Sequence, residues 1–146
     1  MPKGSSIIGL VYLLQIVLTF LFTVLGFICV IKQIEIVSIG IGNVFLGFGV
    51  GNLISLIQSV IIFIVASKTK NFSNFNLAAI IIIIIYLAIG ASFIILSIYL
   101  VGSGGNSYFM LGNFLMGFGA AMIFGSIFCG IIFGKIRRDP TEIYEI

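Results

Sequence analysis

The sequence alternates between long apolar runs and short polar breaks. Each apolar run exceeds the roughly 20 residues that an α-helix needs to cross a bilayer core. The runs cover residues 7–31, 37–66, 77–101 and 108–133, and the breaks cover 32–35, 67–76 and 102–107. This pattern predicts an all-α fold of four long hydrophobic helices.

Isoleucine occupies every position from 80 to 85. In water such a β-branched segment favours strands and aggregation. In apolar surroundings each backbone polar group must find its partner within the segment, so a helix is the stable form. We expect this helix to begin near Asn74 or Asn76, whose side chains can cap the free amides of a first turn.

An offset of 70 residues aligns the second apolar run with the fourth without a gap. Residues 42–49 then fall on 112–119, with identical Gly, Asn and Phe positions. The alignment predicts a duplicated helical hairpin within one structural unit: a first copy at 1–70, and a second copy with a polar C-terminal tail at 71–146. Since each copy has two helices, an axis along the helices relates the copies, as in parallel repeats of membrane proteins.

Both copies carry small or polar residues at four-residue intervals. Small residues at this spacing allow two helix backbones to approach closely, which replaces the hydrophobic driving force that lipid cannot supply. We predict that these residues form the main helix-packing seam: Asn43, Gly47, Gly51, Ser55 and Ser59 in the first copy, and Asn113, Gly117, Ala121, Gly125 and Cys129 in the second.

The composition leaves little room for catalysis. Of 146 residues, 61% are hydrophobic and 8% are charged, against about 25% charged in a soluble domain. Histidine is absent, and the four acidic residues lie outside the apolar runs. General acid-base chemistry and metal sites need such groups in position. We therefore expect no enzyme, no cofactor and no metal, and we expect Cys29 and Cys129 to act as small hydrophobes.

Positive charge gathers at one end of the predicted bundle. With four spans, six of the seven cations share one side and only Lys32 lies on the other. This distribution fits a membrane topology with both termini in the cytoplasm. It also fits a basic face that contacts phosphates of lipid headgroups or of double-stranded DNA. The residues that could make such contacts are Lys68, Lys70, Lys135, Arg137 and Arg138.

Several amides lie inside the apolar runs: Gln15, Asn52, Gln58 and the two asparagines of the predicted packing seam, Asn43 and Asn113. Amides within spans form hydrogen bonds between helices. They can also line a path for a solute, which leaves a small transporter or channel as one hypothesis.

The duplicated, nearly uncharged hairpin resembles the major capsid proteins of spindle-shaped archaeal viruses. Basic residues close each copy, with Lys68 and Lys70 ending the first and Lys135, Arg137 and Arg138 ending the second. The resemblance covers nearly the whole chain as architecture and composition. It implies a virion shell of apolar helices packed between subunits, which encloses double-stranded DNA and changes shape by sliding. The acidic tail at 139–146 departs from that family.

Two functions follow as expectations. The first is a structural virion protein that assembles with itself, passes through the host membrane and buries its apolar surface against identical neighbours. The second is an integral membrane protein of four spans, acting as a subunit or scaffold. Because a helix buried in protein and a helix buried in lipid are both apolar all round, the pattern leaves both open.

Overall fold

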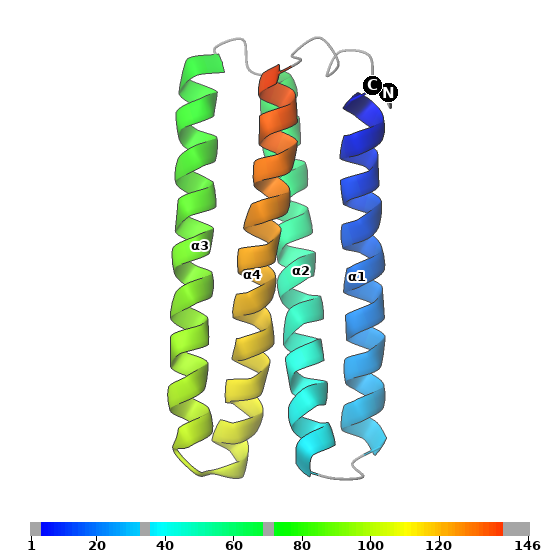
Figure 1. Cartoon of the computed structure of the whole chain (residues 1–146), viewed down its shortest axis with the longest axis vertical. Coiled ribbons are helices and arrows are strands. Elements are labelled where there is room, and N and C mark those ends of the chain that lie inside the picture. Colours follow the sequence, from blue (N-terminus) through cyan, green and yellow to red (C-terminus); the bar gives the residue numbers. More distant parts are fainter. Residues whose placement is uncertain (1–3, 33–35, 69–71, 139–146) are drawn as a thin grey trace.

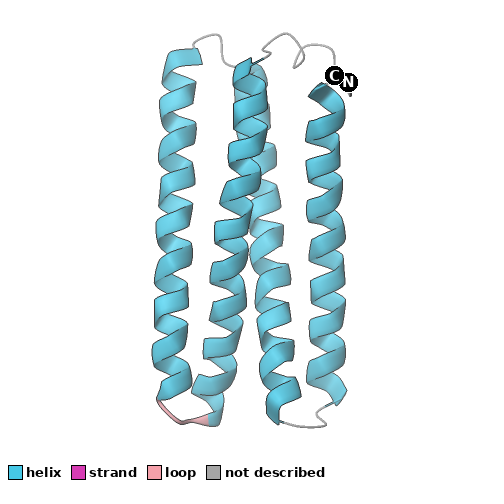
Figure 2. Ribbon diagram, in the orientation of Figure 1, coloured by secondary structure: helices cyan, strands magenta, loops and turns pink. Residues whose placement is uncertain are grey.

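The computed structural model describes residues 4–32, 36–68 and 72–138. Within these ranges, four α-helices occupy every residue except 103–105, and no strand occurs (Figure 2). The all-α, four-helix prediction is therefore confirmed. The helices are α1 (Gly4–Lys32), α2 (Ile36–Lys68), α3 (Phe72–Gly102) and α4 (Asn106–Arg138).

The helices form a flattened bundle (Figure 1). α2 and α4 lie at its centre, run in the same direction and make the most extensive contact between any two helices. α1 packs along α2, and α3 packs along α4. As a result, α1 and α3 occupy opposite edges of the bundle (Figure 1).

The third helix begins earlier than the sequence pattern predicts. α3 starts at Phe72, so Asn74 and Asn76 lie inside the helix and the predicted caps are wrong. Residues 72–76 contain neither proline nor glycine, so nothing in the backbone stops the helix from extending through this polar segment.

The turn between α3 and α4 is tight, as its glycine content predicts. Gly104 adopts a φ of 83°, a left-handed conformation that side chains rarely tolerate. The Ser103 amide donates to the Leu100 carbonyl oxygen at 3.2 Å, and the Ser103 hydroxyl donates to the same oxygen at 2.7 Å. These bonds satisfy a free carbonyl at the end of α3.

Most apolar surface of the edge helices is left uncovered. All four helices are long and apolar enough to cross a membrane. Within the spans, 11% of α1 and 11% of α3 are buried, against 39% of α2 and 50% of α4. Exposed apolar area of this extent requires lipid or other protein to cover it. The chain is thus a hydrophobic helical protein suited to a membrane or to a close-packed assembly.

Candidate functional site: glycine seams and a buried amide cluster

The seam between α2 and α4 depends on two glycines in reciprocal positions. A Cβ on Gly47 would collide with the backbone carbonyl of Phe114, and a Cβ on Gly117 would collide with that of Val44. The residues in these two contacts differ by 70 in both directions. The two helices therefore touch backbone to backbone, which only glycine permits.

The next two residue pairs of the predicted packing seam, Gly51 with Ala121 and Ser55 with Gly125, also lie between α2 and α4. A Cβ on Gly51 would stand 2.8 Å from that of Ala121. The side chain of Ser55 occupies the space beside Gly125, and the Ser55 hydroxyl lies 3.4 Å from the Ala121 carbonyl oxygen. The structure therefore brings together the central ladder residues of α2 and α4.

The two asparagines of the predicted seam each form a hydrogen bond within their own helix, and Asn113 also lies beside Gly40 of α2. The Asn43 amide donates to the Ile39 carbonyl oxygen at 2.9 Å, and the Asn113 amide donates to the Phe109 carbonyl oxygen at 2.8 Å. Each amide thus satisfies a carbonyl of its own helix.

Ser59, the last predicted seam residue of α2, turns toward α1. The hydroxyl of Ser59 contacts the Gln15 side chain of α1, and Cys129 lies fully buried in a core cluster with Ile62 and Ile132. Since each residue advances about 100° around a helix, a four-residue step turns the ladder by about 40°. Over four steps this drift carries the ladder away from its original neighbour.

Two further glycine positions of each repeat, which the predicted packing seam does not include, form the contact between the two helices of a hairpin. A Cβ on Gly42 would stand 2.9 Å from Cys29 on α1, and a Cβ on the equivalent Gly112 would stand 3.0 Å from the Ser97 carbonyl oxygen on α3. Gly49 and Gly119 likewise face α1 and α3. The signal was present as glycines seven residues apart in both copies. Each repeat therefore encodes two contacts, one within its hairpin and one between hairpins.

A buried amide cluster joins α1 to α2. The Asn52 amide donates to the Gln15 carbonyl oxygen at 2.8 Å and to the Thr19 hydroxyl at 2.9 Å. The Ser59 hydroxyl lies 3.3 Å from Oε1 of Gln15, and the Tyr12 hydroxyl donates to the Ser59 carbonyl oxygen at 3.0 Å. Gln15 and Asn52 are both 0% exposed. The predicted hydrogen bonding between helices by amides occurs here.

The cluster belongs to the first hairpin alone. The equivalent contacts of the two hairpins are 70 residues apart on α2 and α4 and 71 apart on α1 and α3, so Asn52 corresponds to Met122 and Gln15 to Tyr86. Neither Met122 nor Tyr86 carries an amide that could repeat the cluster between α3 and α4. Gln58 is also buried, and neither polar atom of its side chain has a hydrogen-bond partner within the described chain.

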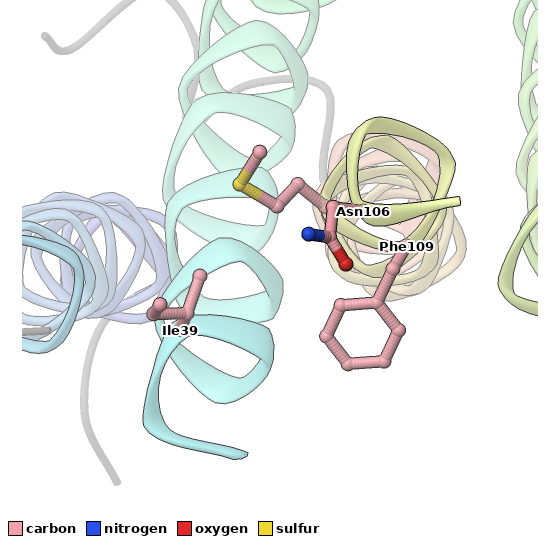
Figure 3. A pocket seen from close by; sticks show the side chains of 4 residues that line it. Ile39, Asn106 and Phe109 are labelled. Carbon is pink, nitrogen blue, oxygen red and sulfur yellow. The ribbon is translucent and has the colours of Figure 1, made fainter. Parts of the chain in front are cut away.

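A pocket of about 220 Å³ opens between the first turns of α2 and α4 (Figure 3). Ile39 lines it from α2, and Asn106, Phe109 and Met110 line it from α4. One amide among apolar side chains offers no group for acid-base chemistry. Among the residues that the structure describes, no group of three or more His, Cys, Asp or Glu side chains could hold a metal ion.

Basic residues lie at both ends of the bundle in unequal number. Lys32 ends α1 at the lower end in Figure 1, whereas α2 and α4 end at the upper end. The side chain of Lys135 is half-buried there, beside Ile7 of α1. Three of the residues predicted to contact phosphate lie at the ends of helices: Lys68 ends α2, and Arg137 and Arg138 end α4. Lys70 lies outside the described residues.

Comparisons with models of known families, with curated proteins and with solved structures find no match to this chain.

Proposed function

We propose that this chain is a non-enzymatic structural protein that builds a virion shell by packing its apolar helices against those of neighbouring copies. One observation carries the proposal: α1 and α3 expose apolar side chains along their whole length. An uncovered helix face of this kind gains roughly 25 cal/mol for each Å² of apolar surface that a neighbour removes from water. The resemblance to capsid proteins of spindle-shaped archaeal viruses gives that neighbour an identity, namely another copy.

Electron microscopy of the protein, purified without detergent from its native source, tests this proposal. We expect ordered tubes or shells in which this chain is the repeating unit, because each copy presents uncovered apolar faces on two opposite edges. Isolated single chains within a lipid belt would contradict the proposal.

The dimensions of the helices favour a second function, a four-span integral membrane subunit or scaffold. The spans contain 26 to 30 residues, which at about 1.5 Å per residue is about 39–45 Å. A bilayer with its headgroup regions is about 40–45 Å thick. This function predicts that the protein stays in cell membranes after alkaline washing, and recovery from nuclease-resistant particles outside cells would contradict it.

The shell function assigns the basic helix ends to the phosphates of enclosed double-stranded DNA. We expect simultaneous replacement of Lys68, Arg137 and Arg138 by Gln to weaken DNA binding and its dependence on salt. Each lost phosphate contact reduces the slope of log K against log salt by about 0.9, so three contacts reduce it by about 2.7. The measurement is a salt titration of DNA binding by assembled protein.

Lys32→Gln is the matched control for this titration. It removes one positive charge from the opposite end of the bundle, where no phosphate contact is proposed, so the slope is expected to stay unchanged. Equal slopes for the triple variant and the unmodified protein would remove DNA as the partner of the basic end.

A further inference from the structure

A groove of about 320 Å³ lies between the start of α1 and the end of α4. Ile7 lines it from α1, and Gly130, Ile131, Gly134 and Lys135 line it from α4. A Cβ on Gly130 or Gly134 would meet no heavy atom of the described chain within 4 Å. The missing side chains of these two glycines therefore leave the groove open.

The groove lies at the level where the apolar spans end. The first membrane-length span begins at Ile7, and the fourth ends at Lys135. Gly130 precedes Lys135 by one and a half turns of helix and so lies about 7.5 Å deeper, at about 1.5 Å per residue. In a bilayer, the glycines and isoleucines of the groove face acyl chains, and Lys135 lies where long basic side chains extend their charge to the headgroups.

A crevice occupies the equivalent position between α2 and α3. Its lining includes Ile61 and Val65 of α2 and Ala78 of α3, and its volume is about 70 Å³. The two hairpins correspond at an offset of 70 residues on α2 and α4 and of 71 on α1 and α3. These three residues therefore occupy the positions of Ile131, Lys135 and Ile7. The duplication thus produces two such spaces, of which the groove is the larger.

The groove differs from its counterpart in charge and in bulk. Val65 stands at the position of Lys135, and Val60 and Ile64 stand at the positions of the two glycines. The equivalent contact between hairpins therefore forms without a cation and without glycine. Glycine within a helix is less favourable than alanine, and these two glycines gain no close helix contact in return. Helix packing does not explain the open space, whereas a ligand that fills it does.

The chemistry of the lining selects an anion with an apolar tail. Lys135 supplies a positive charge, and no carboxylate occurs among the described residues that line the groove. The other lining residues, Ile7, Ile131 and the two glycines, offer no polar side chain. A phosphate with an attached acyl chain satisfies both parts, and basic pockets between membrane helices bind anionic lipid headgroups. A DNA phosphate has no apolar part to fill the rest of the groove.

We infer that the groove binds one anionic phospholipid, with its phosphate at Lys135 and an acyl chain along Gly130 and Gly134. The site is complete within a single chain, so this inference goes beyond the proposed shell and does not depend on it. Because α1 and α4 belong to different hairpins, the bound lipid bridges the two copies of the repeat.

Native mass spectrometry of the detergent-solubilised protein tests the site. Titration with phosphatidylglycerol is expected to show one molecule bound per chain at a lower concentration than any further molecules. Phosphatidylcholine, whose headgroup carries no net charge, is expected to bind more weakly. Successive phosphatidylglycerol molecules that bind with equal affinity would contradict the inference.

Lys135→Gln removes the cation from the groove. We expect it to weaken binding of the first phosphatidylglycerol about fivefold, the contribution of one lysine near a membrane surface. Lys135→Arg keeps the charge and is expected to retain binding. Lys32→Gln is the matched control, because it removes one charge from the opposite end of the bundle, and it is expected to change nothing. Unchanged affinity in Lys135→Gln would overturn the inference.

Gly134→Leu fills the groove. It is expected to abolish binding of the first phosphatidylglycerol while the helix content measured by circular dichroism is kept, since leucine favours a helix more than glycine does. Gly9→Leu is the matched control: a Cβ there also meets no heavy atom within 4 Å, but Gly9 lies about 200° around α1 from Ile7 and points away from the groove. Full binding by Gly134→Leu would show that no acyl chain occupies this space.

Soluble glycerol 3-phosphate separates a lipid from a free phosphate. At the concentration at which phosphatidylglycerol fills the first site, it is expected not to displace the lipid, because it lacks the acyl chain. Displacement would assign the groove to phosphate alone and overturn the inference. A protein without a preferred first lipid would also overturn it and would leave the shell function standing, since electron microscopy tests that function separately.

Discussion

Gly117→Ala is expected to destabilise the fold by about 1–3 kcal/mol, the usual cost of forcing extra atoms into a packed interface. The new methyl group would collide with the Val44 carbonyl on α2. A backbone atom cannot turn aside as a flexible side chain can, so α2 and α4 must move apart. The measurement is the free energy of unfolding of the detergent-solubilised protein in an SDS titration.

Gly130→Ala on the same helix provides the control, and it is expected to act in the opposite direction. A Cβ at Gly130 meets no heavy atom within 4 Å. Replacing glycine with alanine inside a helix then stabilises it by up to about 1 kcal/mol. Equal changes in the two variants would show that the α2–α4 seam does not depend on backbone contact at Gly117.

Asn52→Asp is expected to destabilise the protein by about 2.5–3.5 kcal/mol, the cost of an aspartate at the centre of an apolar helix. The amide that donates to the Gln15 carbonyl and to Thr19 would become an oxygen. The substitution keeps the shape of the side chain, but it places a carboxylate against a carbonyl oxygen 2.8 Å away. The same SDS titration measures the effect.

Asn106→Asp is the matched control, since it makes the same chemical change at an exposed position in the first turn of α4. A negative charge at the start of a helix is favourable by about 0.3–1 kcal/mol. We therefore expect no loss of stability in this variant. If Asn52→Asp were tolerated as well as Asn106→Asp, the amide cluster would not be a buried contact between α1 and α2.

The sequence by itself determined the elements and the composition of their surfaces. Long apolar runs without proline leave the backbone no partner except itself, so each of the four runs becomes a helix. The even number of crossings places the ends of α2 and α4 together, and the charges that follow the runs mark that end. The central part of the helix-packing seam could be predicted because small residues recur at the same interval in both copies.

The tertiary structure alone decided which face of each helix meets which neighbour. A helix that is apolar all round has no amphipathic face to orient it, so hydrophobicity does not specify its rotation. Rotation is fixed instead by steric fit, in which Gly47 faces α4 while Gly42 and Gly49, on the same helix, face α1. The four-residue interval predicted that Ser59 would continue the seam, but the rotation of the helix turns it toward Gln15.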